Sequence, residues 1–118
     1  MTFVNLHNHF DYSILDGGMK VEKGVQRAVE LGQPAIAITD HGTMGGVYEL
    51  YKRSAERIRP IIGIEAYCAP TDRTHKSPVF WGPPDARRDD ISGAGKYTHL
   101  TLLARNAEGM NRDRKSVV

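Results

Sequence analysis

The sequence has little of what marks an unusual class of protein. Its 118 residues contain one cysteine, Cys68, which excludes an intramolecular disulfide. No apolar run approaches the roughly 18 residues that a membrane helix needs, and the N-terminus lacks the basic start and apolar run of a signal peptide. The formal charge of +2, from 16 basic and 14 acidic residues, singles out no nucleic acid, membrane or acidic partner. We therefore expect a cytoplasmic protein with no membrane association.

The apolar pattern predicts strands that alternate with helices. Hydrophobic residues make up 40% of the chain, an ordinary value for one small globular domain. Alternation of strands with helices of this length favours an α/β fold with right-handed crossovers and a parallel sheet or barrel. The predicted strands are 3–6, 35–38, 61–67 and 97–103, and the predicted helices are 21–29 and 47–58.

A long segment, residues 70–95, separates the last two predicted strands. It holds four of the six prolines and the only tryptophan, Trp81. Loops of this length are usually functional or disordered, and composition does not decide between the two.

Metal-ligand side chains stand at or just beyond the ends of three predicted strands. His7 and His9 follow the first strand, Asp40 and His41 follow the second, and Glu65 lies in the third. The carboxyl ends of parallel strands meet at one edge of a sheet, and residues two apart in extended chain point to the same side. Imidazole and carboxylate together suit zinc, manganese or iron, and two such ions hydrolyse phosphate esters. The pattern therefore predicts a metal-dependent phosphoesterase.

Each of these residues also has a plainer interpretation. An isolated His-x-His pair is usually a surface feature, and Glu65 alone is consistent with an exposed strand residue. Spacing alone makes Asp16, beside two glycines, a turn former. His99 fits either a barrel interior or a solvent-facing strand position, and Cys68 fits a small buried hydrophobic side chain.

Three motifs in order resemble the polymerase and histidinol phosphatase (PHP) family. They are HNHFDYS at 7–13, ITDHG at 38–42 and PIIGIEAY at 60–67. Shorter likenesses at 15–17, 69–70 and 97–104 make the chain most similar to the PHP domain at the N-terminus of the bacterial DNA polymerase III alpha subunit.

The resemblance implies a distorted (β/α)7 barrel that binds up to three divalent ions, zinc, manganese or iron. It also implies phosphoesterase or 3′-to-5′ exonuclease activity, with DNA and other replisome subunits as partners of a longer parent polymerase. Asp40 is expected to orient an imidazole, and with His41 it is a candidate catalytic residue. The implied metal ligands are His7, His9, Asp16, His41, Glu65 and His99.

The chain departs from the family pattern towards its C-terminus. The family has further ligands on later strands, a Cys or His and then an Asp-x-His pair, and none is present. We therefore expect residues 1–109 to be the first part of a PHP barrel that is inactive alone. Residues 110–118 are expected to be a non-native tail, because 113–118 resembles a translated sequencing adapter. The alternatives are a stand-alone phosphoesterase such as histidinol phosphatase, and a non-catalytic structural module.

Overall fold

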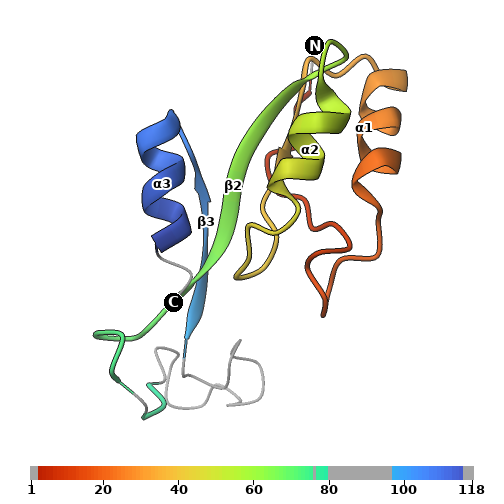
Figure 1. Ribbon diagram of the computed structural model, residues 1–118. Coiled ribbons are helices and arrows are strands. Elements are labelled where there is room, and N and C mark those ends of the chain that lie inside the picture. Colours follow the sequence, from red (N-terminus) through yellow and green to blue (C-terminus); the bar gives the residue numbers. More distant parts are fainter. Residues whose placement is uncertain (1–2, 76, 80–96, 116–118) are drawn as a thin grey trace. The chain divides into compact units, whose positions relative to one another are not determined.

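The computed structural model describes residues 3–75, 77–79 and 97–115, with the backbone alone for 113–115 (Figure 1). The chain divides into two compact units, Met1–Ala66 with Thr101–Val118, and Tyr67–Leu100. No helix within the described ranges is long and apolar enough to cross a membrane. The elements in chain order are α1 (Val21–Glu30), β1 (Ala35–Ile38), α2 (Val47–Ser54), β2 (Arg59–Cys68), β3 (Thr98–Leu103) and α3 (Ala107–Lys115).

Strands β1 and β2 form the parallel pair that the alternating pattern predicts. Their register runs from Ala35 opposite Arg59 to Ile38 opposite Ile62, and α2 makes the connection between them. All four residues of β1 are buried, as expected of a strand covered on both faces. The architecture is therefore mixed α/β with β2 at the centre of a three-stranded sheet.

Strand β3 lies along the other edge of β2 and runs antiparallel to it, which the expectation of a wholly parallel sheet missed (Figure 1). In the first unit, Ala104 N–H donates to Ile62 O at 2.8 Å. In the second unit, the rings of Tyr67 and His99 lie 5.3 Å apart. Residue numbers therefore rise along β2 while they fall along the neighbouring β3. The chain comes back beside the end of β2, and a strand that returns in this way needs no crossover.

Two predicted elements differ from the structure by more than two residues. Residues 3–6 are not assigned as a strand, although Ala37 N–H donates to Asn5 O at 3.4 Å and this segment lies along β1. Helix α2 ends at Ser54 rather than at residue 58, because Ala55 leaves the helical conformation with ψ 128° and Glu56 adopts a φ of 60°. Apolar spacing continues past this turn, so the pattern did not reveal the end of the helix.

Helix α3 crosses the boundary that we expected at residue 109. It runs continuously from Ala107 to Lys115, and Asn106 Oδ1 accepts the N–H of Gly109 near its first turn at 2.9 Å. A non-native tail at 110–118 stays a prediction, since residues 116–118 lie outside the described residues.

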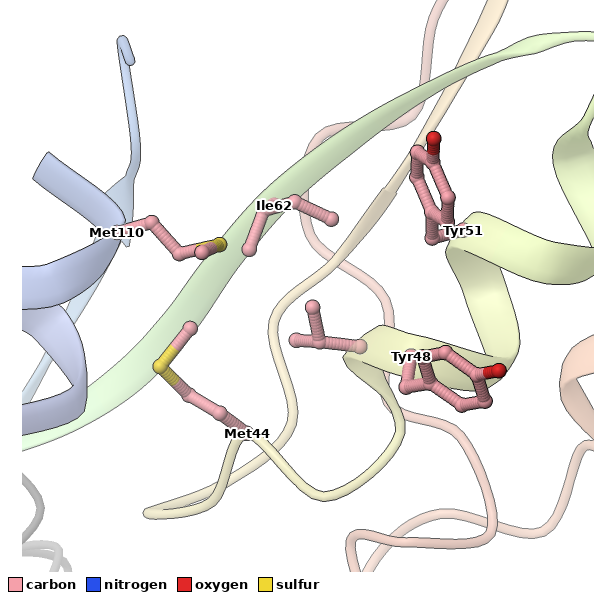
Figure 2. A pocket seen from close by; sticks show the side chains of 6 residues that line it. Met44, Tyr48, Tyr51, Ile62 and Met110 are labelled. Atoms are coloured by element: carbon pink, nitrogen blue, oxygen red, sulfur yellow. The ribbon is translucent and has the colours of Figure 1, made fainter. Parts of the chain in front are cut away.

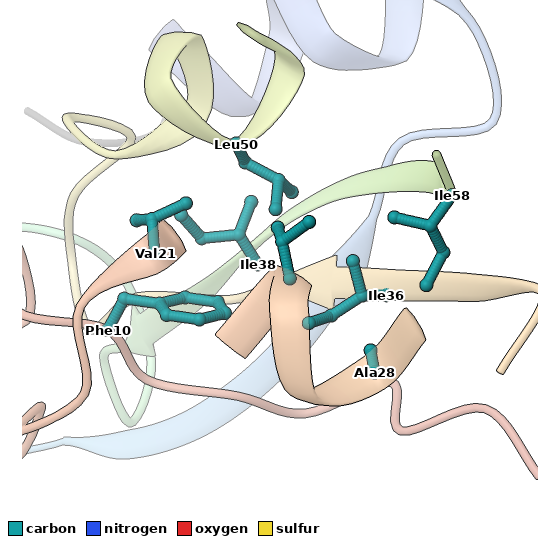
Figure 3. Packing of buried hydrophobic residues seen from close by; sticks show 8 residues of the cluster. Phe10, Val21, Ala28, Ile36, Ile38, Leu50 and Ile58 are labelled. Atoms are coloured by element: carbon teal, nitrogen blue, oxygen red, sulfur yellow. The ribbon is translucent and has the colours of Figure 1, made fainter. Parts of the chain in front are cut away.

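The hydrophobic core packs α1 and α2 against β1 (Figure 3). Leu50 of α2 and Val25 of α1 are fully buried in it. Phe10, which is also fully buried, brings the loop that follows His9 into the same cluster. The core therefore holds the start of the loop that directly follows His9. Its buried members among the described residues are Phe10, Val21, Val25, Ala28, Ile36, Ile38, Leu50 and Ile58.

Candidate metal centre

The segment 7–9 is held so that its two histidines point away from β1. Asn8 N–H donates to Thr39 Oγ1 at 2.9 Å, and Asn8 Nδ2 donates to Ala37 O at 3.0 Å. Thr39 N–H in turn donates to Asn8 O at 3.0 Å. Because successive side chains of extended chain alternate in direction, anchoring Asn8 to β1 sends His7 and His9 to the opposite side.

His7, His9 and Glu65 form the first group of candidate ligands. The Nε2 atoms of both histidines face Glu65 Oε2, at 2.8 Å for His7 and 2.5 Å for His9, and they lie 3.1 Å from each other. Glu65 is buried, not exposed as its isolated position in a strand allowed. Burial alone raises the pKa of Glu65, but the hydrogen bonds from the two imidazoles outweigh it and hold the pKa below its ordinary value.

His9, Asp16 and His41 form the second group. Asp16 Oδ2 lies 2.9 Å from His9 Nδ1 and 3.0 Å from His41 Nδ1. A hydrogen bond from the Ser13 hydroxyl to Asp16 is the largest cause that lowers the pKa of Asp16 to about 2, and His41 and His9 add to it against desolvation. Asp16 is therefore ionised at neutral pH, and it is both a turn residue and a member of the cluster.

The two groups share His9, and the hydrogen-bonding capacity of this ring shows whether a cation fits here. His9 faces a carboxylate at both ring nitrogens, yet a neutral imidazole has one N–H to donate. A cation on one side of the ring removes the conflict, because the carboxylate on the other side then accepts the remaining N–H, as in carboxylate–histidine–metal arrangements. The three donor atoms of the first group lie 2.5–3.1 Å from one another, close enough together to contact a single ion. The residues present fit a divalent ion.

Asp40 acts on the backbone beside the cluster. The structure leaves Asp40 with no exposed surface, and its Oδ1 accepts the N–H of Phe10 at 2.6 Å. Burial raises the pKa of Asp40, and the Phe10 hydrogen bond opposes that rise. This hydrogen bond fixes the peptide that follows His9. The expectation that Asp40 orients an imidazole and its candidate catalytic role both stay predictions.

Two further residues of the prediction belong to the second unit. His99 packs its ring against Tyr67 and Tyr97, with ring centroids 5.3 and 5.5 Å away. Its role as a ligand stays a prediction. Most of the segment 70–95, whose role the composition leaves open, lies outside the described residues. Cys68 is a partly buried free thiol.

An apolar groove of about 490 Å³ differs in composition from the candidate metal centre (Figure 2). Met110 of α3 and Tyr48 and Tyr51 of α2 contribute to it, with Ile62 of β2 between them. Among the described residues its lining has no carboxylate or imidazole, the two kinds of donor that make up the candidate metal centre. The described residues that line it are Met44, Val47, Tyr48, Tyr51, Ile62 and Met110.

Sequence reasoning missed the polar residues that hold the ligands in place. Ser13 and Thr39 are both buried. The Thr39 hydroxyl donates to Asn8 O, between the two histidines, and the Ser13 hydroxyl accepts the N–H of His41. A buried hydroxyl leaves no periodic signal. The available sign was the position of both residues inside the motifs 7–13 and 38–42.

Comparison with known proteins identifies the family of this chain. The family model described as PHP domain matches residues 5–117. The DNA polymerase III subunit alpha of Saccharopolyspora erythraea is 51% identical over 116 residues, covering 92% of this chain and 10% of that protein. The proteins of the same name from Mycobacterium tuberculosis H37Rv and Treponema pallidum are 47% and 42% identical over 110 residues, again covering 92% of this chain. This chain spans 9% and 8% of their lengths. From the motifs, the clustered ligands and these matches, the chain belongs to the PHP domain family.

Proposed function

We propose that the two ligand groups hold divalent ions, zinc, manganese or iron, as part of a phosphoesterase centre. The observation that carries the proposal is His9, which lies between the carboxylates of Glu65 and Asp16 and belongs to both groups. Nitrogen and carboxylate oxygen donors suit these metals. Ions held here supply the Lewis acid that hydrolysis of a phosphate ester requires.

The proposed substrate is DNA, cleaved in the 3′-to-5′ direction within a DNA polymerase III alpha subunit. Relatives of that name match 92% of this chain, and this chain corresponds to a tenth or less of each. We infer that residues 1–109 supply the first part of a (β/α)7 barrel and that DNA and other replisome subunits are partners of the longer protein. Within this part, Glu65 and Asp16 offset the charge of the ions, and Asn8 and Asp40 hold the ligand segment in position.

Metal binding by the 118-residue chain tests the first half of the proposal. The chelator-treated chain is titrated with Zn²⁺ and with Mn²⁺ against a chromophoric chelator. We expect binding that is lost in the double variant His7→Ala and His9→Ala, while His75→Ala, a histidine of the other unit, binds as the unaltered chain does. Equal binding by the double variant contradicts the proposed centre.

Hydrolysis tests the second half, in the complete alpha subunit that we propose contains this chain. A 5′-labelled single-stranded DNA and a small phosphate monoester are offered separately with Mn²⁺. We expect shortening of the DNA from its 3′ end, lost with the same double variant. Hydrolysis of the monoester alone favours a stand-alone phosphoesterase, and metal binding without hydrolysis favours a structural module.

A further inference from the structure

Ser13 is a buried residue that the proposed metal chemistry does not itself use. It has 1% of its surface exposed, and its hydroxyl stands between two members of the second ligand group. Its Oγ contacts Asp16 Oδ1, and the backbone N–H of His41 donates to the same Oγ at 3.0 Å. Residues 13 and 41 are far apart in the sequence, so this hydroxyl links the loop after His9 to the end of β1.

The chemistry of the two partners fixes the direction of both hydrogen bonds. The ionised carboxylate of Asp16 only accepts, and the amide of His41 only donates. The hydroxyl proton of Ser13 therefore points at Asp16, and an oxygen lone pair faces His41. A hydroxyl has one proton and two lone pairs, so it can donate to Asp16 and accept from His41 at once. The side chain of alanine or glycine can do neither.

This hydrogen bond decides which carboxylate oxygen faces the imidazoles. With Oδ1 bound to Ser13, Oδ2 is left for His9 Nδ1 and His41 Nδ1, at 2.9 and 3.0 Å. The terminal torsion of an Asp side chain is broad and roughly two-fold, so it does not fix this orientation by itself.

Apolar packing does not hold Asp16 in place either. Its neighbours Ile14 and Leu15 are 90% and 93% exposed. The backbone of the turn depends on the same serine, because Ser13 O accepts the N–H groups of Asp16 at 3.1 Å and Gly17 at 2.7 Å. Ser13 thus holds the turn at Asp16 next to the cluster, while buried Phe10 holds the start of the same loop in the core.

We propose that Ser13 is a positioning residue of the metal centre, which presents the Asp16 carboxylate and the His41 backbone in the arrangement that binds an ion. This inference rests on the proposed function. It assigns to Ser13 a role in metal affinity, carried through Asp16, and no contact with substrate.

The test compares Zn²⁺ affinity in variants of the 118-residue chain, by competition with a chromophoric chelator. Ser13→Ala is expected to bind about tenfold more weakly, the size of effect found when residues that orient ligands are removed. Ser54→Ala is the matched control, because Ser54 is equally buried and its hydroxyl has no hydrogen-bond partner among the described residues. We expect Ser54→Ala to keep the affinity of the unaltered chain. An affinity of Ser13→Ala within twofold of the unaltered chain overturns the proposal.

A double-mutant cycle separates positioning from a general loss of stability. If Ser13 acts through Asp16, then Ser13→Ala adds no further loss in a chain that carries Asp16→Asn. Losses that add in full overturn the proposal. Circular dichroism establishes that each variant is folded. Should Ser13→Ala not fold, Ser13→Thr, which keeps the hydroxyl, is expected to bind within threefold of the unaltered chain, and a tenfold loss in folded Ser13→Thr overturns the proposal. An unaltered chain that binds no Zn²⁺ contradicts the proposed function instead.

Discussion

Gly17 is the position where one added carbon atom should disturb the centre most. A Cβ at Gly17 would lie 1.6 Å from Phe10 O and 2.5 Å from Phe10 C, whereas real Cβ contacts stay at 3.0 Å or more. Phe10 is fully buried in the core and does not yield, so the turn at Asp16 and Gly17 must move by about 1.4 Å.

Such a movement is large compared with the contacts of Asp16. Its Oδ2 lies 2.9 and 3.0 Å from the two imidazole nitrogens, and a further 1.4 Å takes both contacts beyond hydrogen-bond range. Overpacking of this kind costs about 1–3 kcal/mol of stability. Gly17→Ala should therefore weaken both the fold and the binding of metal.

Gly18→Ala supplies the control, because a Cβ there meets nothing within 4 Å. Urea unfolding should show a loss of about 1–3 kcal/mol for Gly17→Ala, and no loss or a slight gain for Gly18→Ala through the lower entropy of its unfolded chain. Zn²⁺ affinity should fall at least tenfold in Gly17→Ala alone. The reasoning is refuted if the two variants behave alike in both measurements.

Three other predictions follow from the core and the cluster. Leu50→Ala removes a fully buried side chain and should cost about 2–5 kcal/mol in urea unfolding, whereas Leu31→Ala, at a side chain 56% exposed, should cost far less; equal losses would contradict the core described above. Since the pKa of Asp16 is lowered to about 2 from 3.8, its stabilisation is present above pH 4 and disappears as the pH falls towards 2. The unfolding free energy of Asp16→Asn, measured against pH, should lack this part of the acid dependence, and an unchanged profile would refute the assignment. Zn²⁺ at 100 times its dissociation constant should stabilise the chain by about 2.7 kcal/mol. A chelator should reverse that gain, and calorimetric melting that shows no shift would argue against a metal centre in the folded chain.

Local patterns in the sequence were enough to predict most of the first unit. The spacing of apolar residues located α1, and the unbroken apolar run gave β1 with its bounds. The gathering of His7, His9, His41 and Glu65 followed from their places at strand ends, and their contacts confirm that they lie together. The helix and the strand depend on the period of apolar residues, and the gathering of the ligands follows from the rule that strands joined by a crossover helix pair in parallel.

What the sequence did not reveal depends on contacts between distant residues. The direction of β3 is set by the return of the chain, and the spacing of apolar residues in a strand is the same in either direction. Ser13 is polar in a turn, where serine is ordinary, and only its burial against His41 shows a special role. The hydrogen bond from Phe10 N–H to Asp40 likewise joins residues 30 positions apart, and no local pattern indicates it.

The anchoring of Asn8 has a consequence for how this segment tolerates change over evolution. Asn8 is fastened to β1 through Thr39 and Ala37, and the two histidines take their direction from that fastening. An insertion or deletion of one residue between His7 and His9 would turn one ring towards β1, however well the remaining residues were chosen. A change of length between the two histidines is therefore expected to disturb the proposed centre as much as the replacement of one of the rings.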